Sequence, residues 1–270
     1  MLSTENSDRT IDSLGLHPGA DRPGIELRQM DLSGLDLNGI NLSGANAIAA
    51  NLSQTNLSEA NLQGIDLRGA NLQGTNLTGA NLTGAYLNRA QLQGTNLTGA
   101  TLEEARLQVA LYDSKTLWPE RFPYQKSGAV GPKASLAGVF LNTAYLRGAD
   151  LRGANLRGAY LSGTDFTQAN LENAALSGAN LQKAFLTGAN LRNVRFNSAE
   201  LQGADFRGAN LTDATFDQIQ NIAGADFSQA SGLSEEAYRI LSSRPAKELA
   251  TWNPFTRNNT GHSLGLKFGV

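Results

Sequence analysis

The sequence predicts an all-β solenoid with four-cornered coils, and two observations carry that prediction. A large apolar residue returns at every fifth position from Leu27 to Tyr112, with Ala47 as the one small exception, and again from Leu136 to Phe216. The string LQGTNLTGA starts at Leu72 and again at Leu92, 20 residues later. Helices repeat about every 3.6 residues and strands every second residue, so a period of five fits neither element alone.

The five-residue unit indicates which side chains face inward. The 35 in-phase positions of the two blocks hold 29 Leu, four Phe, one Tyr and one Ala. A small or second apolar residue stands two positions earlier, Asn or Asp often lies between the two, and Gly often follows two positions later. A chain that turns a corner in every repeat would bury the two apolar positions, and Gly would relieve the backbone at the corner. The expected core includes Leu72, Leu92, Leu156, Leu176, Phe196 and Phe216.

The longer offset indicates the size of one coil. Thr55, Thr75 and Thr95 take the small inward position at the same 20-residue spacing as the repeated string. Four pentapeptides therefore make one coil, and each residue stacks on the residue 20 positions later. Neighbouring coils would pair their backbones at the usual strand spacing of about 4.8 Å.

The repeated unit, Ala-Asn/Asp-Leu-x-Gly, resembles the A-(D/N)-L-x-x motif of the pentapeptide-repeat family. The resemblance covers Ile25 to about Phe227 and implies a right-handed quadrilateral β-helix. The segments YDSKTLWPERF and ELATWNPFTR are also similar to segments of cyanobacterial members of this family. That similarity indicates a cyanobacterial origin and assigns no activity.

The segments outside the repeats complete the expected organisation. After Phe216 the period slips by one residue, with Ile222 and Phe227 following in the new phase. Ser234 followed by two Glu is a typical helix start, so short helices are expected to cover the C-terminal end of the solenoid. The expected divisions are a mobile tail over 1–24, β-helix blocks over 25–112 and 134–229, an excursion over 113–133, a helical cap over 230–256 and a tail over 257–270.

The excursion contains the candidate docking residues Trp118, Phe122 and Tyr124 together with three Pro. Loops on a rigid scaffold often carry function, and exposed aromatic side chains favour interfaces. The alternatives are a loop whose aromatic rings pack on the solenoid and a hinge between two β-helical halves.

The composition and the motifs argue against catalytic activity. The chain has no Cys, and its two His, His17 and His262, lie near the ends. No Walker-type phosphate loop, HExxH zinc motif or GxSxG elbow is present. The sequence therefore predicts no enzyme, catalytic residue, cofactor or metal site. It also has neither a signal-peptide pattern nor an apolar stretch long enough to span a membrane, so a cytoplasmic protein is expected.

With an enzyme excluded, the function class that the sequence favours is an interaction scaffold whose partner is another protein. The family resemblance adds one alternative, a DNA mimic that binds DNA gyrase, which requires a strongly negative face. Residues 25–112 hold seven acids and four bases, and residues 134–216 hold six acids and seven bases, so the charge argues against mimicry. Arg152, Glu172 and Arg192 are expected to stack as an alternating ladder. Ice binding through Thr and direct nucleic-acid binding lack the necessary arrays, and a monomer is expected.

Overall fold

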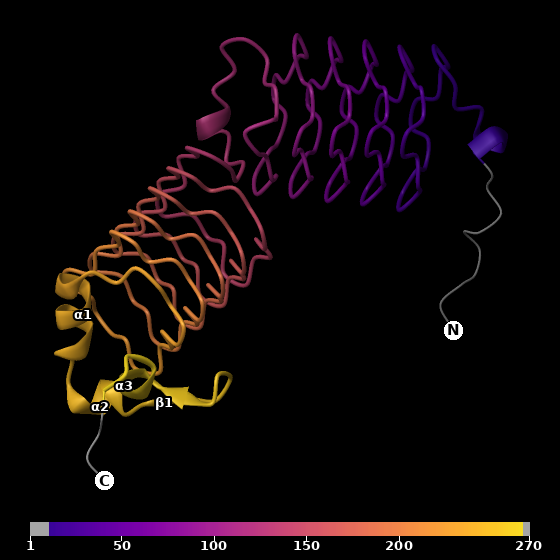
Figure 1. Ribbon diagram of the computed structural model, residues 1–270. Helices are drawn as coiled ribbons and strands as arrows, with labels where there is room; N and C mark the ends of the chain where they lie inside the picture. The colour runs from indigo at the N-terminus through magenta and orange to yellow at the C-terminus, as the bar shows by residue number, and fades with distance from the viewer. Residues whose placement is uncertain (1–10, 267–270) are drawn as a thin grey trace, which may run out of the picture. The chain divides into compact units, whose positions relative to one another are not determined.

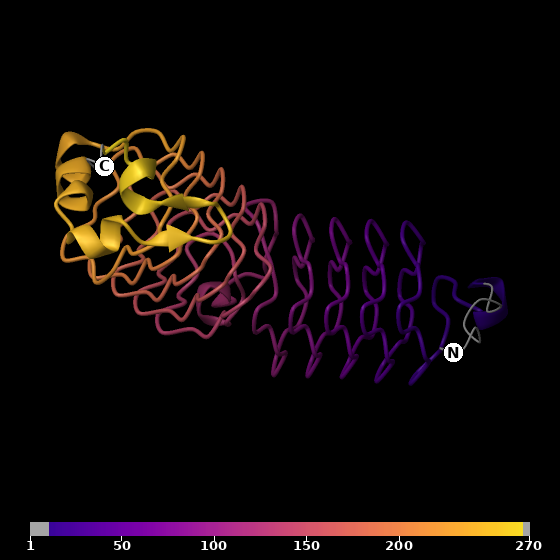
Figure 2. The same cartoon turned by 90° about the horizontal axis from the view of Figure 1, so that it is seen from below.

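The computed structural model describes residues 11–266 and divides into two units, Met1–Val130 and Gly131–Val270, which are described separately. Both units are stacks of coils whose few regular elements lie at the interruption and the ends (Figures 1 and 2). These elements are η1 (Ile11–Leu14), η2 (Tyr124–Lys126), α1 (Glu235–Ser242), α2 (Ala246–Leu249), β1 (Trp252–Asn253), β2 (Asn258–Asn259) and α3 (Thr260–Ser263).

Parallel backbone pairing joins each coil to the next in both units. Asn51 pairs with Asn71 in the first unit, and Asn170 pairs with Asn190 in the second. The same 20-residue offset recurs on all four sides of the coil, so the predicted stacking of four pentapeptides is confirmed. Each coil thereby satisfies the backbone groups of its neighbours, as paired strands do.

The residues that recur in each repeat, Gly and Asn or Asp, are explained by the turn at each corner of the coil. At a typical corner, Gly69 adopts φ +67°, a left-handed angle that glycine reaches without a steric penalty. The Ala70 N–H then donates to the Leu67 carbonyl at 3.0 Å and closes the turn. Asn or Asp is favoured just before the central Leu because its side chain accepts from the turn, as Asn71 Oδ1 does from the Gln73 N–H at 3.1 Å.

The core is a column of apolar side chains inside each unit. All six predicted core residues are fully buried. A fully buried Leu stabilises the fold by about 1.5–3 kcal/mol before side-chain entropy is subtracted. The expected inward Thr column is also present, and the Thr75 hydroxyl donates to the Leu52 carbonyl at 2.7 Å. This hydrogen bond explains why a polar side chain is tolerated there.

The first unit begins its coil earlier than expected. The Gly19 N–H donates to the Asn38 carbonyl at 2.8 Å, and Asp21 pairs with Asn41. Residues 19–24 therefore belong to the solenoid and not to the tail predicted over 1–24, because the backbone pairing continues although the Leu signal has stopped. Residues 1–10 of that tail lie outside the described part of the chain.

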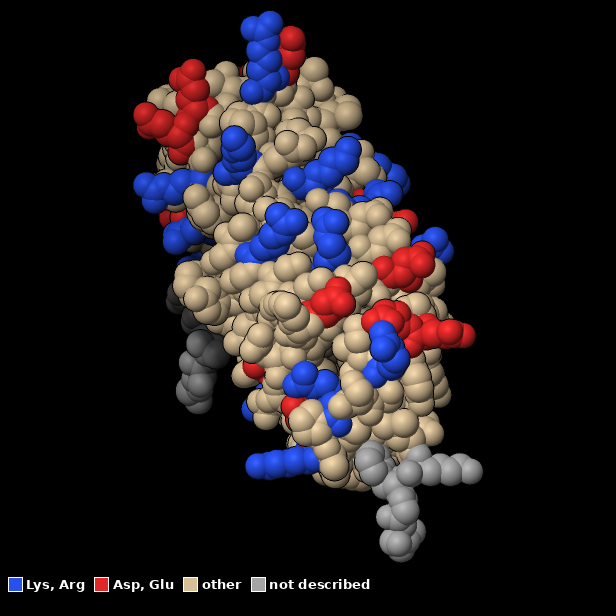
Figure 3. All heavy atoms as spheres, turned by 90° about the vertical axis from the view of Figure 1, so that its left-hand side faces the viewer, with Lys and Arg blue, Asp and Glu red and all other residues tan. Residues whose placement is uncertain are grey.

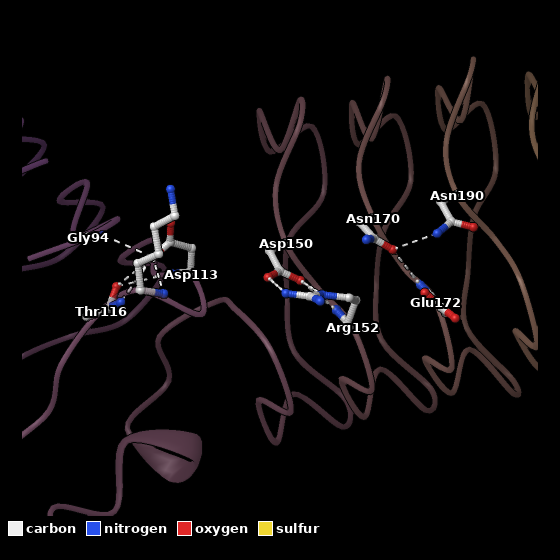
Figure 4. A network of polar contacts seen from close by, with 9 residues as sticks. Gly94, Asp113, Thr116, Asp150, Arg152, Asn170, Glu172 and Asn190 are labelled. Carbon is white, nitrogen blue, oxygen red and sulfur yellow. Dashed lines mark hydrogen bonds and ion pairs between the residues drawn. The ribbon is translucent and has the colours of Figure 1, made fainter.

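The excursion is shorter than the predicted segment 113–133. The Leu117 N–H donates to the Thr95 carbonyl at 2.9 Å, and Val130 pairs with Leu111, so only residues 118–127 leave the coil. The Asp113 carboxylate accepts from the Gly94 N–H at 3.0 Å and the Thr116 N–H at 3.1 Å (Figure 4). This side chain holds the extra residue that shifted the period, which is why the sequence pattern ended before the coil did.

The end of the second unit has the predicted shift in the repeat period, but its C-terminal helices and strands differ from the predicted helical cap. Glu200 pairs with Asn221, an offset of 21, which confirms the one-residue slip. Ser234 caps α1 by accepting from the Ala237 N–H, so the expected helix start is confirmed. The predicted helical cap over 230–256 ends at Leu249, because Trp252 begins the β1–β2 hairpin. The expected tail from 257 contains β2 and α3, and residues 267–270 lie outside the description.

Side chains of the C-terminal segment take the place of a further coil. The Ile222 N–H donates to the Glu248 carboxylate at 3.1 Å, and the Phe227 N–H donates to Ser263 Oγ at 3.1 Å. Arg244 donates to the Ile219 carbonyl at 2.9 Å. An open coil would leave such groups unpaired, so these contacts close the edge of the last coil.

Candidate interaction surface

The predicted docking residues form one packed cluster in the excursion. Trp118 stacks on Tyr124 with ring centroids 5.4 Å apart and on Phe122 at 5.6 Å. Tyr112, which is buried in the coil, meets Trp118 edge-on at 5.4 Å. Trp118, Phe122 and Tyr124 are each half-buried, so much of their apolar surface contacts one another. These contacts agree with the alternative of a loop whose aromatic rings pack on the solenoid, and docking through these residues stays a prediction.

The most exposed aromatic side chains lie elsewhere, on two adjacent sides of the second unit. Phe140 is 73% exposed and Tyr145 is 72% exposed, and each occupies the outward position that usually holds Asn or Asp. Tyr160 lies one coil beyond Phe140 and stacks on it with ring centroids 4.4 Å apart and planes 5° apart. Phe185 lies two coils beyond Tyr145 on the second of these sides. We call Phe140, Tyr145, Tyr160 and Phe185 the aromatic strip.

The C-terminal hairpin extends this apolar surface. Phe255, which is 67% exposed, contacts Phe185 edge-on with centroids 6.5 Å apart. Asn253 anchors the hairpin by donating to the Gly224 carbonyl at 2.7 Å. Trp252 is also exposed beside it. The strip was not predicted from the sequence, although its aromatic residues stand at outward repeat positions that the five-residue period identifies.

Charged side chains are distributed as local pairs. Arg152 binds Asp150 through Nε at 2.8 Å and Nη2 at 2.6 Å (Figure 4). The predicted ladder with Glu172 is therefore replaced by a fork between residues two apart, since both side chains of an Asp-x-Arg unit point outward from one corner. The same fork joins Asp66 to Arg68, where the guanidinium holds the pKa of the carboxyl below its usual range. Exposed pairs of this kind contribute little stability.

No continuous acidic surface covers the face drawn in Figure 3, where basic and acidic side chains lie among uncharged ones.

A model of the family described as Pentapeptide repeats matches residues 25–64, 65–103, 132–163, 144–182 and 174–213. These ranges together cover more than half of the chain.

The chain belongs to the pentapeptide-repeat family. The solved structures that are similar to it include HetL, Rfr23 and QnrB1. HetL, involved in heterocyst differentiation regulation in the cyanobacterium Nostoc sp. strain PCC 7120, is 31% identical over 77% of this chain and 89% of its own, with a TM-score of 0.30. Rfr23 from the cyanobacterium Cyanothece 51142 is 35% identical over 37% of this chain and 88% of its own, with a TM-score of 0.24. QnrB1, a plasmid-mediated fluoroquinolone resistance protein, is 17% identical over 82% of this chain and 97% of its own, with a TM-score of 0.32.

A search of curated proteins found no match. None of the helices within the described residues of this pentapeptide-repeat chain combines the length and the apolar character that a membrane span requires. Residues 11–266 also contain no group of three His, Cys, Asp or Glu side chains placed to hold a metal ion.

The first unit of the pentapeptide-repeat chain carries ladders of side-chain amides that end on carboxylates. Asn71 donates to Asn51 at 3.1 Å, and Asn51 donates to Asp31 at 2.9 Å. On each of the four sides, the ladder ends in the N-terminal coil on an acid, whose carboxylate accepts from the Asn of the next coil. The pairs are Asn41–Asp21, Asn46–Glu26, Asn51–Asp31 and Asn56–Asp36. A carboxylate only accepts, so it ends the ladder without leaving a donor unpaired. These acids were visible in the sequence, but the direction of the ladder was not.

Glu200, near the C-terminal end of this pentapeptide-repeat chain, is a partly buried carboxyl whose pKa is raised. Its Oε1 is buried without a hydrogen-bond partner. Burial raises the pKa of the Glu200 carboxyl, the Gln202 N–H opposes this, and the Glu248 carboxylate adds to the raised pKa while Arg244 opposes it. The folded chain thus holds the proton more tightly than the unfolded chain. The contribution of Glu200 to the free energy of unfolding is therefore fully present below the ordinary Glu pKa and is lost as the pH rises through the raised one.

Replacing Glu200 by Gln should remove this loss of stability. We expect the Glu200→Gln variant to melt at a higher temperature than the native protein at pH 8 and at about the same temperature at pH 4. Thermal unfolding followed by circular dichroism at both pH values measures the difference. Glu172→Gln, which removes the same charge outside the C-terminal contacts, is the control. A Glu200→Gln gain that is equal at both pH values would contradict the role of ionisation.

Proposed function

We propose that this pentapeptide-repeat protein is a non-catalytic scaffold that binds another protein through the aromatic strip. In this proposal the solenoid is a right-handed quadrilateral β-helix, acts as a monomer and works in the cytoplasm. The observation that carries the proposal is the exposure of Phe140 and Tyr145, both above 70%, on a rigid backbone. Aromatic side chains of this kind supply much of the binding energy at protein interfaces.

The rigidity of the surface supports the proposal. Phe140 and Tyr160 stand on backbones joined by the hydrogen bond from the Tyr160 N–H to the Val139 carbonyl at 2.8 Å. Their rings already stack, so a partner would meet an ordered platform. Little side-chain entropy would be lost on binding, which favours affinity. The local Asp–Arg pairs beside the strip would help to set orientation more than strength.

The test is a capture experiment with matched variants. Native extract is passed over the immobilised protein, and the captured protein is then purified and titrated against each variant. We expect Phe140→Ala together with Tyr160→Ala to weaken binding by about tenfold or more, because the platform is removed. Tyr238→Ala, which removes an exposed aromatic ring on α1 away from the strip, should bind as the native protein does.

A second variant set distinguishes the strip from the excursion. The triple variant Trp118→Ala, Phe122→Ala and Tyr124→Ala, checked for equal thermal stability, removes the packed cluster. Full binding by this variant and loss of binding by the strip variant would support the proposal. Loss of binding by the triple variant alone would move the docking surface to the excursion and refute the strip.

A further inference from the structure

A half-open groove lies along one corner of the first unit and carries an excess of hydrogen-bond donors. Its volume is about 500 Å³. The lining residues are Arg68, Gly69, Asn88, Arg89, Gln108 and Val109. They come from the same corner of three successive coils, since each is 20 residues from its counterpart in the next coil. We call this feature the corner groove.

The groove is hollow because of the residues at its left-handed corner positions. Gly69 has φ +67°, and a Cβ built on it would meet no atom within 4 Å. In the next coil the same position holds Arg89, with φ +61°. The missing side chain in one coil thus leaves space beside a long cationic side chain in the next.

The polar groups around this space are mainly donors. Arg68 uses Nε and Nη2 to bind Asp66 at 2.9 and 2.6 Å, and its Nη1 makes no hydrogen bond to any described residue. The Arg89 guanidinium also makes no hydrogen bond or ion pair within residues 11–266. Asn88 donates to Gln108 Oε1 at 2.7 Å, which leaves the Gln108 amide N–H groups available.

The charge around the groove is positive, although residues 25–112 carry more acids than bases. Asp66 is already engaged by Arg68. On the adjoining side of the coil, Arg106 lies over the Tyr86 ring at 4.8 Å and adds a third guanidinium near this corner. A ligand entering the groove would meet cations from two coils and one amide donor.

We infer that the corner groove binds the phosphate group of a small phosphorylated ligand through Arg68 and Arg89. A tetrahedral dianion accepts hydrogen bonds in several directions, so it can use two guanidiniums and the Gln108 amide at once. A single planar carboxylate is satisfied by one guanidinium, as Asp66 is by Arg68. Because the groove is open to solvent, binding should weaken with salt.

The test is a titration of the full-length protein with inorganic phosphate at constant ionic strength, followed by backbone amide NMR. We expect saturable shifts at Gly69, Arg89 and Gln108. Arg89→Gln should weaken the apparent affinity by about tenfold, because one of two charged donors is lost. This variant should fold, since Gln54 occupies the equivalent corner position with φ +60°.

The control is Arg121→Gln, which removes the same charge from an exposed side chain in the excursion. It should bind phosphate as the native protein does. Shifts that fail to saturate, or equal weakening by Arg121→Gln and Arg89→Gln, would overturn the site.

A parallel titration with adenosine monophosphate identifies the source of the phosphate. Tighter binding of the nucleotide, lost in Arg89→Gln, would support an organic phosphate ligand. Equal affinities for the two compounds, both lost in Arg89→Gln, would support free phosphate.

Discussion

Replacing Leu156 by Asp should unfold much of the second unit at room temperature. Leu156 is fully buried in the apolar column, and its N–H donates to the Ala175 carbonyl at 2.8 Å. The variant loses the Leu burial and places a carboxyl where no donor is available. We expect a loss of more than about 4 kcal/mol, measured by thermal unfolding and by the β-sheet signal in circular dichroism. Because each coil is stabilised only by the coils beside it, unfolding should begin at the coil of Leu156 and then pass to its neighbours.

Asn142→Asp is the matched control for this prediction. It adds the same acid to the outside of the same unit, where Asn142 is exposed and its Oδ1 accepts from the Ser162 N–H at 2.9 Å. An Asp keeps that acceptor, so stability should change by less than about 1 kcal/mol. If Leu156→Asp melted at the same temperature as Asn142→Asp, the inward register of the central Leu would be wrong.

Replacing Glu248 by Ala should open the C-terminal edge of the solenoid. The Glu248 carboxylate accepts from the Ile222 N–H at 3.1 Å and from two nitrogens of Arg244 at 3.1 and 2.8 Å. The variant leaves a backbone donor of the last coil unpaired and removes the partner of a largely buried guanidinium. We expect a loss of about 2–3 kcal/mol and faster amide exchange at Ile222, measured by thermal unfolding and hydrogen exchange.

Glu236→Ala provides the comparison for the cap. Glu236 lies on α1 and pairs with Arg239, and both side chains are mostly exposed. Its removal should cost less than about 1 kcal/mol, as for other surface ion pairs. Equal effects of the two substitutions, with unchanged exchange at Ile222, would mean that Glu248 does not seal the last coil.

The coil itself was predictable because its signal is repeated many times. A Leu every five residues, together with the string that recurs after 20, admits one simple packing in which each coil rests on the next. The six core residues and the inward Thr column followed from that register. The boundaries were less predictable, because residues 19–24 and Leu117 continue the pairing with few of the residues that define the pattern.

The exposure of the aromatic side chains was not predicted, for a physical reason. In the excursion, Trp118 and Tyr124 stack on each other because aromatic rings bury their own apolar area when they can. Phe140 and Tyr160 are held apart from the core by the outward direction of their repeat position. They therefore remain exposed although they stack on each other.

By itself the sequence determined the coil, its register and its core, because these depend on a short pattern repeated along the chain. It also determined the capping of α1 by Ser234, because that signal lies within a few neighbouring residues. Only the tertiary structure decided which aromatic side chains stay exposed, that Arg152 pairs with Asp150, and how Glu248 replaces a missing coil. These features depend on side chains from different coils or from the C-terminal segment meeting in space. The spacing of these residues along the chain does not predict their contacts. Backbone pairing and burial in the folded chain bring the side chains together.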